Sequence, residues 1–492
     1  MTTEVVPPGP FGSPVPEQEE AATLRADTLN LFDSTAVAVS SVAPSYSLAA
    51  TISFLFVASA FAGPAVIWIS FIPVLFIAIA YFHLNRKDPN CGASYTWLSK
   101  LMHPMVGWFN GWVQLAASVL FCVSAPILAG TNTLAFFNSV GWISSSTASN
   151  KWLVAVVGIA WLAFITFICV YGIRWTTNFQ WIMVIIEYVA VVVVSFWGVI
   201  KVAVHHPVGS RGFHWSWFSP SSIHGVTGLA AGAVLGVFFF WGWDTSANLN
   251  EESKSANKIP GQAGIISMFV LLAIFLLNIV AAQMLLPSKE LASQGSNILF
   301  YFGNQVGGKW VGYLMIVAVL SSTVGTTQTT LLPASRISLS MARDRVFPKV
   351  FARVSGSRLT PLIGTVILAS LSLLGILATT GDASINTAFS NLINDIGVLI
   401  AFYYGVTGLA CAWAYRKVAF QRVGFFFSGV LLPFLGGLFL LWVGYQVIKQ
   451  SGSSSSWVVG AFLLGIPLVI VARLTTKGDF FKQKMITYDS ID

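Results

Sequence analysis

The sequence predicts an all-α membrane protein of twelve transmembrane helices, with a 5+5 inverted repeat followed by two C-terminal helices. Three observations lead to this fold class. Hydrophobic residues make up 55% of the 492 residues and charged residues only 9%, far below the roughly 25% charge of a soluble domain. Apolar stretches long enough to cross a bilayer, which takes ~20 residues, recur along the chain. The first and sixth of these stretches are each interrupted by helix-breaking residues.

Basic residues predict the orientation. Of the 26 Lys and Arg residues, twenty fall in loops on one side of the expected membrane. The six on the other side are Lys151, Lys201, Arg211, Lys289, Lys309 and Lys449. Because Lys and Arg concentrate in cytoplasmic loops, we expect a multi-pass protein of the cell membrane with both termini in the cytoplasm. The net charge of +8 is then a topology signal, and we expect the lipid bilayer as a partner and no nucleic acid.

The expected segments follow from composition and span length. Residues 1–30, rich in Pro and Glu, are expected to be a disordered cytoplasmic tail. Spans 1–5 are expected within residues 31–204 and are followed by an external loop at 205–224. Spans 6–10 are expected within residues 225–416, spans 11 and 12 within 417–474, and a second cytoplasmic tail at 475–492. The spans themselves are expected at 34–60, 64–83, 106–137, 152–171, 178–200, from 225 onward, and at 259–286, 310–335, 361–380, 387–415, 424–448 and 457–474.

The sixth span changes character along its length. It begins as an apolar helix of small residues, reaches four consecutive aromatics at 238–241, and turns polar after Gly242 at Asp244. An aspartate at membrane depth is costly, and irregular backbone there is tolerated only where it is buried in protein or lines a watery cavity. We therefore expect a discontinuous helix, broken near 240–243, beside a binding site.

The first span contains a second break. Pro44 lies in its middle, surrounded by the hydroxyls of Ser40, Ser41, Ser45 and Ser47. Proline removes a backbone donor and clashes with the preceding turn, although a simple kink healed by serine side chains is the alternative. Two broken helices, one at the start of each set of five spans of opposite topology, are typical of an inverted-repeat secondary transporter.

Three motifs carry a family resemblance. After span 2 the chain reads DPNCGASYTWLSKLMHPMVGWFNGW, in span 6 FFFWGWDTSANLNEESKSANKIP, and after span 8 ASRISLSMARDRVFPKVFARV. With these motifs in order, the chain resembles amino acid permeases of the amino acid–polyamine–organocation superfamily over about residues 30–475. The resemblance implies the LeuT-type fold and transport by alternating access, with no enzymatic activity, catalytic residue, cofactor or metal. Many members carry Gly-x-Gly in the span 1 break, where this chain has Ala43-Pro44-Ser45.

The expected substrate site lies at the two breaks. Half-helix N-termini offer free N–H groups and partial positive charge to a substrate carboxylate. At the resembled positions an aromatic in span 6 often gates the site, which points to Phe238, while Tyr46 and Trp241 are candidates to cover a bound side chain. The candidate substrate-binding residues are Val42, Ala43, Pro44, Ser45, Tyr46, Ser47, Phe238, Trp241, Gly242 and Asp244.

The acids at membrane depth are Glu187, Asp244 and Asp395, and the expected spans hold no Lys or Arg at that depth. Such acids usually face the protein interior and mark a pathway, so the site suits a zwitterion or a cation. For Asp244, capping of the break is the alternative to substrate contact. For Asp395 we expect a structural hydrogen bond to a neighbouring helix. Glu251 and Glu252 are expected to pair with cytoplasmic Arg or Lys in an inner gate.

Glu187 is the candidate for proton coupling. At 1.5 Å per residue it lies near the midplane of span 5, where several relatives of the resembled superfamily hold a lysine. Burial disfavours the charged form of a carboxyl group, which favours proton exchange at this position. The alternatives are a structural glutamic acid and a sodium site built from Ser321, Ser322 and Thr323 with the span 1 carbonyls, and sodium is the less favoured ion.

The predicted function is therefore uptake of an amino acid or related amine, zwitterionic or cationic, by a secondary active transporter coupled to protons. A polyamine or organic cation transporter and an amino acid exchanger of the same fold remain alternatives. A channel would show pore loops or rings of repeated residues, and an intramembrane hydrolase would need a nucleophile–base pair or a His-rich metal motif. Neither pattern is found in the sequence.

Overall fold

The computed structural model describes residues 28–490 except 172, 224, 355–360, 383, 453–455 and 477, and the side chains of 171–184 also lie outside the description. The described part is helical, and its extended pairing is one isolated parallel bridge between Leu29 and Ser253. The α-helices are α1 (Leu31–Val42), α2 (Pro44–Ser59), α3 (Gly63–Lys87), α4 (Ser94–Leu101), α5 (Pro104–Ser139), α6 (Ser145–Ala148), α7 (Lys151–Tyr171), α8 (Ile173–His205), α9 (Gly225–Phe239), α10 (Thr245–Asn248), α11 (Ile259–Leu285), α12 (Ser288–Ser293), α13 (Ile298–Gly307), α14 (Lys309–Arg343), α15 (Leu362–Thr379), α16 (Ile385–Ala414), α17 (Val423–Phe425), α18 (Leu432–Ser451) and α19 (Ser456–Thr475).

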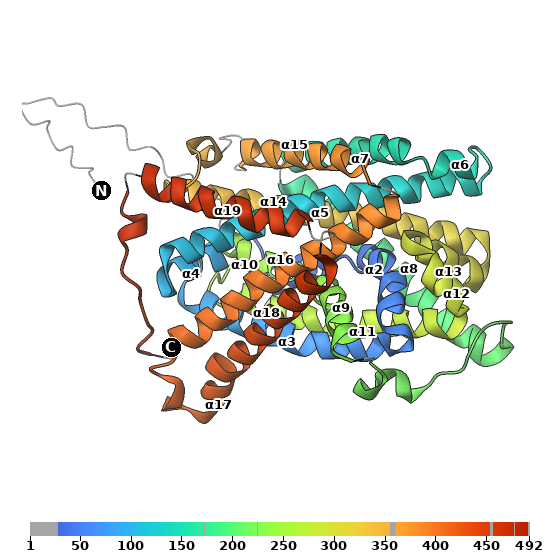
Figure 1. The fold of residues 1–492 in the computed structure, drawn as a ribbon, viewed down its shortest axis with the longest axis horizontal. Helices are drawn as coiled ribbons and strands as arrows, with labels where there is room; N and C mark the ends of the chain where they lie inside the picture. The colour runs from blue at the N-terminus through green and yellow to red at the C-terminus, as the bar shows by residue number, and fades with distance from the viewer. Residues whose placement is uncertain are drawn as a thin grey trace, which may run out of the picture.

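The long helices pack side by side in one bundle (Figure 1). α16 packs against α18 and α5, α14 against α5 and α8, and α11 against α3. The short helices α4, α10 and α17 lie toward the left end in Figure 1, and α6, α12 and α13 toward the right end. We call these the α4 end and the α13 end of the bundle. Short connections at two opposite ends are the arrangement that a chain crossing back and forth produces.

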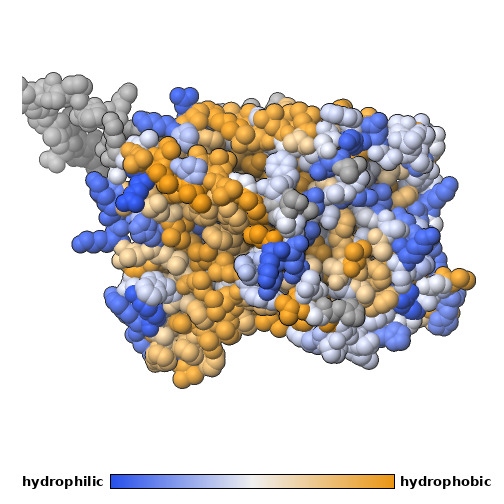
Figure 2. All heavy atoms as spheres, viewed as in Figure 1, coloured by the Kyte–Doolittle hydropathy of each residue, from blue (hydrophilic) through white to orange (hydrophobic). Residues whose placement is uncertain are grey.

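The described residues contain ten candidate membrane spans, so the predicted count of twelve remains a prediction. The first candidate, Leu31–Lys87, has 57 residues, more than twice the ~20 residues that one crossing needs, and it runs through α1, α2 and α3. The 15-residue helix α9 counts only as a shorter apolar helix. Hydrophobic side chains cover much of the face in Figure 2, while hydrophilic ones lie mainly toward the left and right ends, with one further hydrophilic group near the middle.

The predicted break in span 1 is confirmed. α1 ends at Val42, Ala43 takes a left-handed conformation with φ 51°, and α2 begins at Pro44. Proline is favoured at the first position of a helix, because its φ is already helical and its missing N–H is one that has no intrahelical partner there. The same residue that cannot continue α1 is therefore a good start for α2.

The predicted break in span 6 is also confirmed. α9 ends at Phe239, residues 240–244 form a turn, and the short helix α10 follows. Within the turn Gly242 has φ 114°, a conformation that only glycine adopts without strain. The two breaks divide the bundle at a similar depth and supply the residues of the site described below.

The segments outside the spans lie partly within the described residues. Of the tail expected at 1–30, residues 1–27 lie outside the described residues, and Leu29 pairs with Ser253. The loop expected at 205–224 holds two short 3-10 helices, and its residue 224 lies outside the described residues. The C-terminal segment returns along the α4 end, where the Ile486 N–H donates to the Lys100 carbonyl at 2.9 Å.

Candidate functional site

The two breaks contact each other directly. A Cβ atom added to Gly242 would lie 2.9 Å from the carbonyl carbon and oxygen of Ser41, so only glycine permits this approach. The hydroxyls of Ser41 and Thr245 lie 2.8 Å apart, and the Thr326 hydroxyl of α14 donates to the Ser41 carbonyl at 2.7 Å. The end of α1, the span 6 turn and α14 are thus joined at one place.

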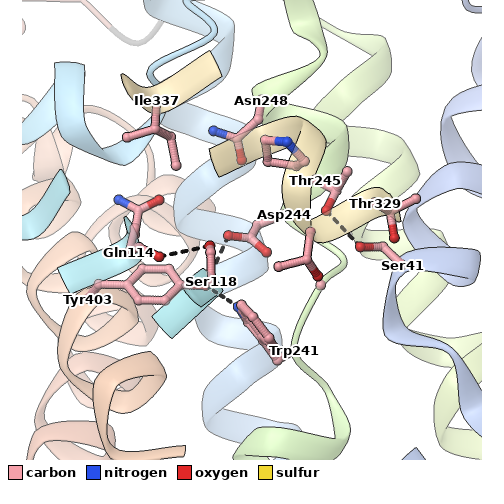
Figure 3. Close-up of a pocket in the computed structure, with 13 residues that line it drawn as sticks. Ser41, Gln114, Ser118, Trp241, Asp244, Thr245, Asn248, Thr329, Ile337 and Tyr403 are labelled. Carbon is pink, nitrogen blue, oxygen red and sulfur yellow. Dashed lines mark hydrogen bonds between the residues drawn. The ribbon is translucent and has the colours of Figure 1, made fainter. Parts of the chain in front are cut away.

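A cavity of about 30 Å³ lies beside this contact (Figure 3). It has room for about two water molecules, so a larger guest requires its walls to move. Asp244 is the one carboxylate among the described residues that line it, and no Lys, Arg or His is among them. The other polar walls come from α1, α5, α10, α14 and α16. They are formed by Ser41, Gln114, Ser118, Thr245, Asn248, Thr329, Thr330 and Tyr403.

Asp244 is held by two tyrosines of α16. The Tyr404 hydroxyl donates to Oδ1 at 2.8 Å and the Tyr403 hydroxyl donates to Oδ2 at 3.2 Å, while Trp241 Nε1 donates to the Tyr403 oxygen at 2.5 Å. Asp244 is 6% exposed, and its side chain makes no capping hydrogen bond to α10. The carboxylate is therefore oriented by neutral donors and keeps acceptor capacity toward the cavity, since an ionised carboxylate has about four lone-pair sites.

Glu187 of α8 lies at the N-terminus of α2. Its Oε1 accepts the Ser45 N–H at 2.8 Å and the Ser322 hydroxyl at 2.7 Å, and the Ser322 oxygen accepts the Tyr46 N–H at 3.0 Å. These N–H groups are among the four that have no partner within a helix's first turn. A carboxylate at this position is favoured by the helix dipole and by the two charge-assisted hydrogen bonds.

The backbone groups of residues 42–47, which were predicted to bind the substrate, contact other groups of the chain in this structure. Pro44 has no N–H, and the N–H groups of Ser45 and Tyr46 already contact Glu187 and Ser322. The Ser47 N–H donates to the Ala43 carbonyl, and the Ser47 hydroxyl donates to the Val42 carbonyl at 2.8 Å. The chain's own groups therefore engage the backbone N–H groups of this segment, although the buried Ser45 hydroxyl has no hydrogen-bond partner in the described part of the chain. None of residues 42–47 lines the cavity, whereas Ser41 and residues of α10 do.

The predicted gating aromatics form a cluster with a residue of α5. Phe121 packs edge-to-face against Tyr46 and Trp241, with ring centroids 5.1 and 5.0 Å apart. Phe238 lies 6.3 Å from both Tyr46 and Phe121. We call Tyr46, Phe121, Phe238 and Trp241 the aromatic cluster. Trp241 also lines the cavity, so the cluster covers it on one side.

The three hydroxyls of the possible ion site point in different directions. Ser321 donates to the Ala318 carbonyl and Thr323 to the Val319 carbonyl, both on their own helix. Ser322 alone contacts Glu187. The structure therefore does not bring the three together around one point.

Two ion pairs lie on the α10 side of the cavity, as expected for Glu251 and Glu252. Arg336 contacts Glu252 through two nitrogens, with Nη2 2.8 Å from Oε2, and both side chains are almost fully buried. Arg343 Nη1 lies 3.4 Å from Glu251 Oε2, and the Cys91 N–H donates to Glu251 at 3.0 Å. Burial opposes ionisation of Glu251, but the Cys91 and Arg343 contacts outweigh it and lower the pKa of this carboxyl.

The expectation for Asp395 is confirmed. Its Oδ2 accepts the N–H groups of Trp457 and Val458 at 3.1 and 3.3 Å, in the first turn of α19. Asp395 is therefore a cap that joins α16 to α19.

Several residues of the site have no counterpart among the predicted ones. Tyr403 and Tyr404 hold Asp244, and Gln114 and Ser118 line the cavity. The two tyrosines are adjacent in an apolar stretch, where aromatics usually serve packing. The sequence signal that could have identified them is that two adjacent tyrosines lie in an expected span, at about the depth of the buried Asp244.

Known transporters are similar in sequence to this chain over most of its length. The family model for amino acid permeases matches residues 29–473. The chain is 26% identical over 434 residues to the low-affinity putrescine importer PlaP of Escherichia coli K12, covering 85% of this chain and 87% of the relative. It is 23% identical to the branched-chain amino acid permease BcaP of Lactococcus lactis, covering 84% and 88%. It is 24% identical to the human large neutral amino acids transporter small subunit 2, covering 70% and 61%. The chain belongs to the amino acid permease family of membrane transporters.

Proposed function

We propose that this protein is a secondary active transporter that moves an amine-bearing substrate, an amino acid or a polyamine, across the cell membrane together with protons. The single observation that carries the proposal is Asp244, the one carboxylate among the described residues that line the cavity. It lies at the break of one helix and beside the break of another. An ammonium group is common to amino acids and polyamines and is the natural partner of such an acid.

The broken helices support alternating access. In inverted-repeat transporters the substrate lies between discontinuous helices near the membrane midplane, and one repeat moves against the other. We place the two repeats at 31–204 and 225–416, within twelve spans and with both termini cytoplasmic. The aromatic cluster then serves as the gate on one side of the cavity, and the buried Glu252–Arg336 pair as the inner gate on the other.

Proton coupling is assigned to Glu187. Its carboxyl group is 2% exposed, it forms no ion pair with any described residue, and it touches both α2 and α14. A change in its protonation would alter its hydrogen bonds with Ser45 and Ser322, which link these helices. Sodium is less favoured, because the hydroxyls of Ser321, Ser322 and Thr323 donate to three different acceptors and are not gathered around one point.

A polyamine or other organic cation is the second candidate substrate. It is favoured by the lack of a Lys, Arg or His among the described lining residues, since such a residue would hold a substrate carboxylate. The printed names of the relatives include both a putrescine importer and amino acid transporters. An exchange mode, with one substrate leaving as another enters, is compatible with the same site.

Uptake into vesicles that contain the purified protein tests the proposal. Radiolabelled putrescine and amino acids are offered while proton and sodium gradients are imposed independently. We expect accumulation to follow the proton gradient alone. Glu187→Gln should abolish accumulation while still allowing exchange of substrate down its own gradient. Asp395→Asn, which changes another buried acid, is the matched control and should accumulate normally. Full accumulation by Glu187→Gln, or accumulation driven by sodium alone, would refute proton coupling through Glu187.

A further inference from the structure

The anion-binding end of α2 is occupied by a carboxylate of the protein itself. Glu187 Oε1 accepts the Ser45 N–H directly, and Ser322 connects the Tyr46 N–H to the same oxygen. With Pro44 at the first helical position, the backbone N–H donors of the first turn are used, whereas the buried Ser45 hydroxyl has no hydrogen-bond partner among the described groups. A carboxylate that arrived with a substrate would have to displace Glu187, which is buried and has no basic partner among the described residues.

The cavity offers no other place for a carboxylate. Its one charged wall is Asp244, which repels an anion, and its lining residues in the described chain include no cation. The neutral amides of Gln114 and Asn248 already donate to the Ser94 hydroxyl and to the Cys91 carbonyl, so a carboxylate here would meet no positive charge to offset its repulsion by Asp244. A substrate amine therefore has a partner in this site, whereas a substrate carboxylate does not.

The separation along α14 between the Glu187 contact and the cavity suggests which substrates would detect this difference. Ser322 contacts Glu187 and Thr329 lines the cavity on the same helix. Seven residues separate them, which corresponds to about 10 Å along α14. A dibasic amino acid held at Asp244 by its side-chain ammonium group would direct its carboxylate over several bonds toward α2. The corresponding diamine has no carboxylate to place.

We propose that Glu187 is a specificity-determining residue, whose carboxyl group occupies the anion site of α2 and thereby selects aliphatic amines that lack a carboxylate. This inference rests on the proposed function, because it takes Asp244 as the ammonium site. It adds a role for Glu187 that does not depend on proton movement. The group fills the space at the α2 N-terminus whether or not it carries a proton.

Equilibrium binding to the purified, detergent-solubilised full chain tests the proposal without any ion gradient. The probes are two matched pairs that differ only by the α-carboxylate, putrescine with ornithine and cadaverine with lysine. We expect each diamine to bind at least about tenfold more tightly than its amino acid. In Glu187→Ala the Ser45 N–H and the Ser322 hydroxyl lose their acceptor. The amino acids should therefore gain at least about tenfold in affinity, while the diamines change by less than about threefold.

Two further variants keep the test decisive if Glu187→Ala fails to fold. Glu187→Gln keeps an oxygen that accepts the Ser45 N–H, so it should increase the affinity for ornithine less than Glu187→Ala does. Ser322→Ala removes the hydroxyl that orients Glu187 and should give a small gain in the same direction. Thermal unfolding of each variant separates loss of folding from altered selectivity.

Three results would overturn the inference. They are equal or tighter binding of the amino acid in the unmodified chain, an unchanged ratio in the Glu187 variants, and failure of all four probes to bind. The vesicle assay judges the proposed function separately. If the protein prefers diamines but its uptake does not follow proton gradients, the selectivity inference stands and proton coupling is refuted. If uptake follows the proton gradient but both members of each pair bind equally, proton coupling stands and the selectivity inference is refuted.

Discussion

The guanidinium of Arg336 contacts the carboxylate of Glu252 through two nitrogens, in surroundings where both side chains are almost fully buried. This pair joins the long helix α14 to the loop after α10. Burying both charges is costly, and their attraction repays the cost only while both are present. The pair therefore fixes the position of this loop against α14 more than it adds net stability.

Removing one member of this pair should be worse than removing both. We expect Arg336→Leu or Glu252→Leu to lower the free energy of unfolding by about 3–5 kcal/mol, because each leaves one buried charge without a partner. The double variant should cost less than either single one. Unfolding in detergent measures all three. Arg343→Leu is the control, since its ion pair with Glu251 is partly exposed and should contribute less than about 1 kcal/mol. A double variant as unstable as the sum of the singles would contradict this account.

Substitutions of the two buried aspartates, Asp244 and Asp395, should distinguish a residue that binds substrate from one that only stabilises the fold. Asp244→Asn should weaken binding of an ammonium-bearing substrate by at least about 30-fold, roughly 2 kcal/mol, because truncating a buried charge partner costs this much or more. Asp395→Asn should leave affinity unchanged within about threefold. Asp395 caps α19, so this change should lower stability by about 1 kcal/mol. Equilibrium binding and thermal unfolding on both variants decide the matter. Equal losses of affinity in the two variants would show that Asp244 does not bind the substrate.

The contact between the two breaks should depend on the absence of a side chain at Gly242. Gly242→Ala adds left-handed strain of about 1–2 kcal/mol and places a Cβ 2.9 Å from the backbone of Ser41. We expect it to lower both stability and substrate affinity. Gly141→Ala isolates the strain, because Gly141 also has positive φ but no atom lies within 4 Å of its Cβ position. If the two variants lose the same stability and the same substrate affinity, the close approach of Gly242 to Ser41 does not contribute to function.

The gating role of Phe238 can be separated from its packing role by a neighbour. Both Phe238 and Phe239 are buried, but Phe239 packs against Phe275 of α11 at 4.9 Å, away from the aromatic cluster. Truncation to alanine should lower the stability of both variants, because a buried Phe→Ala change costs about 3–5 kcal/mol. Phe238→Ala should impair transport more than binding, whereas Phe239→Ala should not. Uptake rates and affinities measured on both variants test this, and parallel effects would identify Phe238 as packing alone.

The features that depend on local chemistry were predictable from the sequence. The membrane class follows from composition, since so little charge cannot cover a soluble fold. Both breaks follow from residues that cannot continue a helix, Pro44 because it lacks an N–H and the 242–244 turn because it combines glycine with a buried acid. The pairing of Glu251 and Glu252 with basic residues, and a hydrogen bond between Asp395 and a neighbouring helix, were predictable because an acid removed from water needs a partner.

The choice of partners was decided only by the tertiary structure. Glu187 and Ser45 are 142 residues apart, and Asp244 and Tyr404 are 160 residues apart, so their contacts depend on how whole helices pack and rotate. Ser321, Ser322 and Thr323 are similar hydroxyls in sequence, yet only Ser322 faces Glu187, because successive residues on a helix point about 100° apart. The sequence thus determined which groups must be satisfied inside the membrane, and the helix packing determined that α2 receives a carboxylate from the chain itself.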